Sequence, residues 1–161
     1  MKVGKISETV LKRSILNQIK HRRNEVLLGP AVGEDCSAIA LAEDEVLVLS
    51  SDPITGAIKD IGTLAVHITA NDLASSGAEP VGLMLTILLP DGSSEEELRA
   101  MMQDMESVCD RLNIEIIGGH TEVTRAVTQP IVTVTGVGKI KREELIKTSD
   151  AVPGQEIVMT K

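Results

Sequence analysis

Acidic side chains stand at three places in the sequence, two of them at the ends of expected strands. Glu34 and Asp35 precede a short apolar run, Asp52 follows a second run, and Asp72 lies within a helical pattern. If Asp35, Asp52 and Asp72 converge to about 5 Å, each pair of carboxylates repels by roughly 3 kcal/mol at an effective dielectric constant near 20. Such a cluster calls for a hard cation, and all-oxygen ligands suit Mg²⁺. The alternative, which spacing alone favours, is that each residue forms a turn or caps a helix.

Asp72 is the most informative of these residues. At 100° per residue it falls within about 80° of Leu64, Ala65 and Ile68, on an apolar stripe. An unpaired buried carboxylate costs several kcal/mol, so either a cation or a set of hydrogen-bond donors must meet it. A structural hydrogen bond to a neighbouring turn and a metal-binding role fit this pattern equally well.

A Gly-Gly pair follows a short apolar run and is the second candidate for ligand binding. In Gly118-Gly119-His120-Thr121 the backbone can approach a phosphate closely with its N–H groups pointing outward. His120 is a candidate general base or phosphate donor, although a histidine after a turn more often makes a local hydrogen bond. The motif by itself is a weak signal.

Hydrophobic periodicity predicts the elements that position these residues. Ser7 caps a helix with apolar residues at helical spacing over 10–19, which ends in the basic run 20–23. The apolar runs 36–41 and 46–50, separated by an acidic turn, predict a pair of strands. The remaining elements are a helix over 60–77, a strand over 81–89, a helix over 94–112 with a Ser94/Glu97 capping box, and strands over 114–117 and 131–137.

The composition bounds the class of protein. With 161 residues, 42% of them hydrophobic, the chain is expected to form one domain over 1–161. A net charge of -8 argues against nucleic-acid binding, and the absence of a long apolar run or a signal-peptide pattern predicts a cytoplasmic protein outside the membrane. Two cysteines are too few for a disulfide framework or a structural zinc site.

The end of the chain resembles the beginning of another strand. The apolar residues 157–159 follow a Pro-Gly turn, and the sequence stops two residues later. We expect either a truncated protein or an edge strand that a partner chain completes, and the sequence does not separate the two.

In this order, these pieces resemble the N-terminal domain of the family that contains aminoimidazole ribonucleotide (AIR) synthetase, thiamine-monophosphate kinase, selenophosphate synthetase and the HypE proteins. The resemblance covers roughly residues 30 to 160. The complete N-D-L-A-x-x-G-A motif over 71–78 is the most specific match. The other motifs are G-D-D-A as Gly33-Glu34-Asp35-Cys36, T-D as Ser51-Asp52, and G-G-D-T as Gly118-Gly119-His120-Thr121.

The resemblance implies an α+β domain with a mixed, mainly antiparallel sheet and helices on one face, which pairs with a second copy into a dimer barrel. It implies ATP and Mg²⁺ at the barrel rim. The implied Mg²⁺ ligands are Asp35, Asp52 and Asp72, and the implied phosphate neighbours are Asn71, Gly118, Gly119, His120 and Thr121. Two departures are Glu34, a mild change from Asp, and His120, which replaces an Asp although imidazole is a poor Mg²⁺ ligand.

Within the family, the segment 60–78 and the strand after Pro80 resemble the hydrogenase-maturation branch most. This branch implies a homodimer, a hydrogenase-maturation partner protein, and ATP-dependent activation of an amide or thiocarboxamide oxygen. A C-terminal domain that completes the active site is absent from the chain, so we expect it to be inactive alone. The alternatives are a domain of a thiamine-monophosphate-kinase-like phosphotransferase and a non-catalytic dimerisation module. A full-length gene ending in Pro-Arg-x-Cys would favour the hydrogenase-maturation branch.

Overall fold

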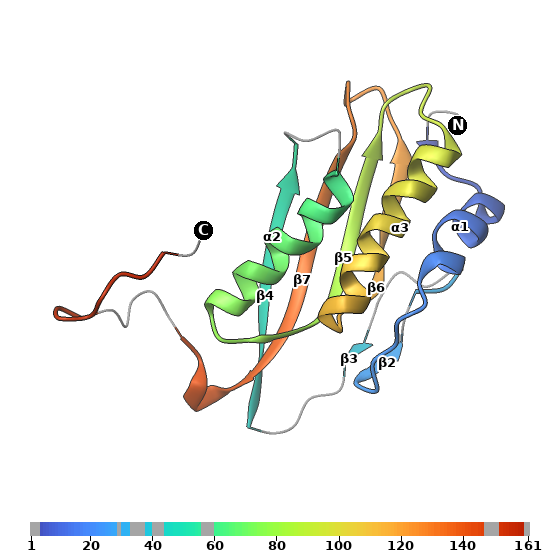
Figure 1. The fold of residues 1–161 in the computed structure, drawn as a ribbon. Helices are drawn as coiled ribbons and strands as arrows, with labels where there is room; N and C mark the ends of the chain where they lie inside the picture. Colours follow the sequence, from blue (N-terminus) through green and yellow to red (C-terminus); the bar gives the residue numbers. More distant parts are fainter. Residues whose placement is uncertain are drawn as a thin grey trace.

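A five-stranded mixed sheet with helices on one side forms the domain (Figure 1). The computed structural model describes residues 4–28, 30–32, 38–39, 44–55, 60–146 and 152–159. The elements are β1 (Gly4–Lys5), α1 (Glu8–Ser14), η1 (Leu16–Gln18), β2 (Val26–Leu28), β3 (Ala38–Ile39), β4 (Glu45–Ile54), α2 (Ile61–Ser75), β5 (Glu79–Leu89), α3 (Glu95–Leu112), β6 (Glu115–Val123), β7 (Ile131–Lys141) and η2 (Arg142–Glu144).

The strands of the large sheet follow the order β1-β6-β5-β7-β4. Only the β5–β6 pair of this sheet is parallel, and its other pairs are antiparallel. The predicted mixed, mainly antiparallel sheet with helices on one face is therefore confirmed.

Helix α3 forms as its sequence predicts. Ser94 accepts a hydrogen bond from the Glu97 N–H at 3.1 Å, and the Ser94 N–H donates to the Glu97 carboxylate at 2.8 Å, which completes the capping box. Met101, Met102 and Met105 are buried against the sheet. The three methionines fill the core, where unbranched side chains adapt to irregular gaps.

The first helix is shorter than the periodicity predicts. Ser7 caps α1 as expected, but the α-helix ends at Ser14, the 3₁₀ turn η1 follows, and the basic run 20–23 lies outside any helix or strand. The N–H groups of Lys20 and His21 donate to the buried carboxylate of Glu106 at 2.6 and 2.8 Å. Since these N–H groups find partners outside a helix, the prediction of a helix C-terminus at the basic run is wrong.

The predicted pairing of 36–41 with 46–50 is also wrong. Of the first run the structure describes β3, which pairs with β2 in a separate two-stranded sheet. Strand β4 lies at the edge of the large sheet and pairs with β7 over ten residues. The acidic turn between the runs favours a hairpin locally, whereas β7 offers β4 a much longer ladder of backbone hydrogen bonds.

Helix α2 packs on the sheet through a face that differs from the predicted stripe. Leu64 and Ile68 are 40% and 38% exposed, while Ala65, Val66 and Leu73 are fully buried. The buried side of α2 thus packs on the sheet, whereas Asp72, in the row with the half-exposed Leu64 and Ile68, reaches Ser50 on the helix side of β4. Because the helix is apolar on most of its surface, its sequence does not determine which residues face the core.

The face of the sheet opposite the helices is uncovered by any described element. Burial alternates along β4, and Leu47 and Leu49 are 45% and 64% exposed on this open face. Across the same face, the Ser51 and Thr135 hydroxyls are 2.8 Å apart. The resemblance implies a second copy on this face, which the single chain does not contain.

Residues 152–159 extend away from the sheet without forming a strand (Figure 1). Ile157, Val158 and Met159 are almost fully exposed, so the predicted strand at this end is not formed within the chain. Among the described residues no helix combines the length and apolarity needed to cross a membrane.

Candidate functional site

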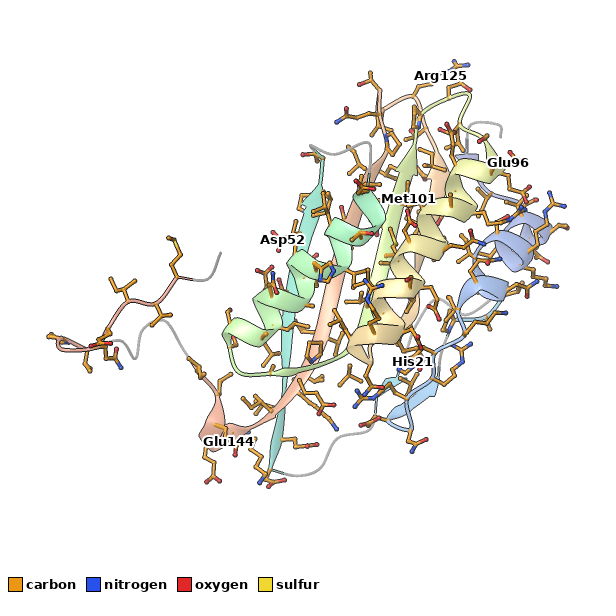
Figure 2. The ribbon with its side chains drawn as sticks, in the orientation of Figure 1. His21, Asp52, Glu96, Met101, Arg125 and Glu144 are labelled. Carbon is orange, nitrogen blue, oxygen red and sulfur yellow. The ribbon has the colours of Figure 1, made fainter. Side chains whose placement is uncertain are left out.

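Two of the predicted acidic residues meet at one serine. The Ser50 hydroxyl lies 3.0 Å from Oδ2 of Asp72 and 3.3 Å from Oδ2 of Asp52. Figure 2 labels Asp52 beside β4, and the shared contact with Ser50 places it on the side of the strand that α2 covers. A hydroxyl carries one proton and donates to one of these oxygens at a time, so the two carboxylates lie within about 6 Å of each other with one shared donor. We call Ser50, Asp52 and Asp72 the acidic pair site.

A glycine on β7 lets α2 approach closely enough to form this site. Gly136 is the register partner of Ser50, and a Cβ on Gly136 would lie 2.4 Å from the Thr69 methyl carbon of α2. Thr69 is buried and donates its hydroxyl hydrogen to the Ala65 carbonyl at 3.0 Å, which fixes its rotamer. Because Gly136 has no side chain, α2 can pack close to β7 and to the neighbouring strand β4.

The surroundings of the acidic pair favour a cation. Asp72 lies in the last turn of α2, where the helix macrodipole is negative and attracts positive charge. Within the described segments, no Lys or Arg forms an ion pair with Asp52 or Asp72. Asn71 is exposed next to Asp72 and adds a neutral oxygen and an N–H₂ group to this edge.

The third predicted ligand, Asp35, lies outside the described residues. The described part of the chain contains no group of three or more His, Cys, Asp and Glu side chains arranged to hold a metal ion. The structure thus brings together two of the three predicted metal ligands and leaves the third as a prediction.

The glycine motif lies within a strand rather than after one. Strand β6 continues through Gly118, Gly119, His120 and Thr121 in register with β5, so the prediction that a strand ends at residue 117 is wrong. Gly119 has φ +146°, and a Cβ there would lie 1.9 Å from the Leu85 carbonyl oxygen. The glycine is needed for the close approach of β5, which is a structural reason for its presence.

Strand alternation separates the residues of this motif. Thr121 is buried on the helix side, whereas His120 lies on the open face, where its Nε2 is 3.1 Å from Oε2 of Glu122. All four residues of the motif also contribute to the lining of a pocket of about 260 Å³ below α1. The rest of that pocket is aliphatic, with Leu11, Ile15 and Ile87 among its walls.

The acidic pair and the glycine motif do not meet within one chain. Asp52, Val134, Leu85 and Gly119 occupy one row of register partners across β4, β7, β5 and β6. Three strand spacings separate the ends of this row by about 14 Å. Val134 and Leu85 are buried between those ends. A phosphate group that touches Asp52 therefore cannot touch Gly119 of the same chain.

Ion pairs hold the N-terminal segment against α3 and β6. Their carboxylates have Arg partners, in contrast to the carboxylates of the acidic pair. Arg13 forms a two-point hydrogen-bonded ion pair with Glu95, which also accepts from the Ser14 hydroxyl at 2.7 Å. The hydrogen bond from Arg13 is the main cause that lowers the pKa of Glu95 to about 2. On the next strand, the buried Glu115 accepts from the Arg22 guanidinium at 2.9 Å. These carboxylates are already neutralised, unlike Asp52 and Asp72.

Two site features were not anticipated from the sequence. Ser50 bridges the acidic pair, and its position two residues before Asp52 on an alternating strand is the signal that both point to one face. Glu122 pairs with His120 through the same two-residue spacing. Cys109 offers no nucleophile, because burial raises the pKa of its thiol to about 12.

The comparisons with known proteins identify the family. The profile of the AIR synthase related protein N-terminal domain matches residues 33–140. The match covers more than half of the chain, including the acidic pair and the glycine motif, and the chain belongs to this family.

The curated relatives come from two branches of this family, the hydrogenase-maturation proteins and the thiamine-monophosphate kinases. A hydrogenase expression/formation protein of Methanocaldococcus jannaschii is 27% identical over 161 residues, which are 98% of this chain and 48% of that protein. The carbamoyl dehydratase HypE of Cupriavidus necator is 30% identical over 135 residues, 80% of this chain and 38% of that protein. Thiamine-monophosphate kinase of Salmonella typhimurium is 28% identical over 153 residues, 89% of this chain and 45% of the kinase.

Solved structures agree in fold. Hydrogenase maturation protein HypE in complex with ATP superposes with a TM-score of 0.79 at 26% identity, over 94% of this chain and 45% of that one. A HypE–HypF complex matches with a TM-score of 0.56 at 26% identity, over 63% of this chain and 35% of that one. The chain thus spans about half the length or less of the relatives it matches.

Proposed function

We propose that this domain binds the phosphates of ATP through Mg²⁺ at the acidic pair site. The observation that carries the proposal is the approach of Asp52 and Asp72 to one hydroxyl without a neutralising Lys or Arg in the described segments. The likeness to HypE in complex with ATP supports the choice of nucleotide.

The donor set fits this metal. Mg²⁺ prefers oxygen ligands, and it is commonly held by one or two carboxylates together with waters and substrate phosphates. Asp52 and Asp72 would hold the ion, and Asp35 is the third ligand that the family resemblance implies. When bound, Mg²⁺ neutralises phosphate charge. The residues of this chain position the ion: Ser50 orients the two carboxylates, and the exposed Asn71 offers hydrogen bonds next to them.

For the whole protein we propose an ATP-dependent maturation activity. One relative is named carbamoyl dehydratase, a name that denotes removal of the elements of water from a carbamoyl group. In such a reaction ATP would turn the amide oxygen into a leaving group. The match to a HypE–HypF complex supports a hydrogenase-maturation protein as partner. The match to a thiamine-monophosphate kinase favours the second candidate, direct phosphorylation of a small substrate. In both cases the acidic pair would have the same task.

We also propose that two copies pair through the open face of the sheet. Leu47 and Leu49 expose apolar surface there, and pairing would cover it. Because one chain keeps the acidic pair and the glycine motif about 14 Å apart, a second copy is also the route by which further groups can reach a nucleotide. Such a dimer is compatible with both enzymatic candidates. Dimerisation without nucleotide binding would instead make the chain a non-catalytic dimerisation module.

Titration calorimetry tests the nucleotide site directly. We expect ADP and a non-hydrolysable ATP analogue to bind the chain in the presence of Mg²⁺ and not in EDTA. Asp72→Asn should abolish this binding, because it removes one of the two charges of the acidic pair. Asp104→Asn, on the exposed face of α3, is the matched control and should bind as the parent does. Absence of Mg²⁺-dependent heat with the parent chain would contradict the proposal.

The dimer is tested by light scattering coupled to size-exclusion chromatography. Leu49→Asp places a charge in the middle of the open face and should yield monomers. Leu112→Asp introduces the same charge at a 40% exposed position on α3 and should leave the dimer intact. A parent chain that is monomeric at all concentrations, or equal masses for the two variants, would refute pairing through this face.

A further inference from the structure

Helix α2 ends in a glycine cap one turn after Asp72. Gly77 has φ +77°, a left-handed conformation that favours glycine. The Ala78 N–H donates to the Leu73 carbonyl at 3.1 Å, which is the long hydrogen bond of a Schellman motif. The Ser75 hydroxyl donates to the backbone carbonyl of Asp72 at 2.7 Å. The place of Asp72 therefore depends on how this end of the helix is held.

The chain that follows β7 packs on the glycine cap. The Ile146 N–H donates to the Ser76 carbonyl at 3.1 Å, which gives a partner to a carbonyl at the open end of the helix. A Cβ on Gly77 would lie 3.0 Å from Cδ1 of Ile140 and 3.3 Å from Cδ1 of Ile146, so both isoleucines lie against the glycine. Figure 1 shows η2 and the end of β7 beside the turn that follows α2. A segment distant in the sequence thus completes the helix end.

The two carboxylates of the acidic pair are held in different ways. Asp52 lies within β4, which pairs with β7 over ten residues, so the ladder of backbone hydrogen bonds fixes its position. Asp72 lies in the last turn of a helix, where carbonyls lack partners within the helix and the backbone frays. Its Oδ2 is 3.0 Å from the Ser50 hydroxyl, and a displacement of about 1 Å would break this hydrogen bond. Asp72 is therefore the member of the pair that needs support from outside its own element.

We propose that Ile146 is a positioning residue for the acidic pair site. Through its contacts with the glycine cap it holds the last turn of α2, so that the Asp72 carboxylate stays within reach of Ser50. Strand β7 pairs with β4 and continues into the segment that carries Ile146, so one strand sets the places of both carboxylates. The chain beyond β7 is thereby coupled to the site. The consequence for nucleotide binding rests on the proposed function.

Mg²⁺-dependent binding of ADP tests this role with three substitutions. Ile146→Ala removes the side chain from the glycine cap and should weaken binding by about five- to tenfold in Kd. Ile146→Val keeps most of the contact and should bind nearly as the parent does. Ile157→Ala makes the same change at a fully exposed position of the C-terminal segment and should leave Kd unchanged. Because Ile146 is 59% exposed, Ile146→Ala should remain folded, which its melting temperature checks.

A second readout follows Asp72 itself and needs no nucleotide. In the metal-free chain at neutral pH, Ile146→Ala should shift the ¹³C resonance of the Asp72 carboxylate. It should also accelerate hydrogen exchange of the Gly77 and Ala78 N–H groups, because the cap opens more often. Ile157→Ala should change neither quantity.

The two readouts separate failure of the positioning role from failure of the nucleotide site. An Asp72 resonance or an ADP affinity that stays at the parent value in Ile146→Ala would overturn the inference, and so would equal weakening by Ile157→Ala. If the parent chain binds no ADP, the proposed function fails, and the resonance and exchange rates still decide whether Ile146 positions Asp72.

Discussion

Asp72→Asn should stabilise the metal-free domain while removing its response to Mg²⁺ and nucleotide. The Asp52 and Asp72 carboxylates lie within about 6 Å of each other around Ser50. At about 5.5 Å, two unit charges repel by about 0.8 kcal/mol at the dielectric constant of water and by about 3 kcal/mol at an effective value of 20. Both side chains are partly exposed, so the lower part of this range applies, and we expect a gain of about 1 kcal/mol. Asparagine still accepts the Ser50 hydrogen bond, so the charge alone is removed.

Thermal unfolding with and without ligand is the assay. In EDTA, a gain of about 1 kcal/mol raises the melting temperature by about 3 °C for a domain of this size. With Mg²⁺ and ADP at about 100 times Kd, the parent gains about 2.7 kcal/mol and becomes the more stable protein, whereas the variant gains nothing. The order of the two melting temperatures should therefore invert on addition of ligand.

The opposite result in EDTA would refute this reasoning. If Asp72→Asn lowers the free energy of unfolding by about 1 kcal/mol or more, the carboxylate is a structural hydrogen-bond acceptor, the other role that its place in the sequence allows. Asp104→Asn removes an exposed carboxylate of α3 and should stay within about 0.5 kcal/mol of the parent under both conditions.

Further predictions concern acid stability and packing. The pKa of Glu95 falls from 4.5 to about 2, chiefly through the hydrogen bond from Arg13, so its stabilising contribution is present above about pH 4.5 and is lost as the pH falls toward 2. Glu95→Gln should flatten the fall in stability across that range in chemical unfolding curves, whereas the exposed Glu96→Gln should not. Gly136→Ala puts a Cβ 2.4 Å from a buried methyl of α2, so it should lower the free energy of unfolding by about 1–3 kcal/mol and weaken Mg²⁺-dependent nucleotide binding. Gly92→Ala has no atom within 4 Å of its Cβ and should keep nucleotide binding, and equal binding by both glycine variants would contradict the packing argument.

Local signals predicted the elements that depend on local interactions. The capping box at Ser94 and the one-sided apolar pattern of α3 are satisfied within the helix and its contact with the sheet, so that helix forms where the sequence indicates. The strands beginning at Glu79 and Ile131 were also predictable, since both are apolar and rich in residues that favour strands.

Elements that depend on distant partners could not be predicted from the sequence alone. The chain after Ser14 leaves the helix because Glu106, on a helix far along the sequence, accepts its backbone N–H groups. The orientation of α2 depends on Gly136, because the helix packs closely against this residue and a side chain there would collide with Thr69. The proximity of Asp52 and Asp72 likewise depends on this packing. The sequence alone therefore did not establish that the two carboxylates lie close together.

The replacement of an aspartate by His120 has a different consequence in the structure than in the sequence. In the sequence, His120 is a poor Mg²⁺ ligand at a position where the G-G-D-T motif has an aspartate. In the structure, His120 lies three strands away from Asp52 and on the opposite face of the sheet, so it cannot join the acidic pair of its own chain. The charge at Asp52 and Asp72 is unaffected by the replacement. Within one chain, Mg²⁺ binding at the acidic pair should therefore depend on Asp72 and not on His120.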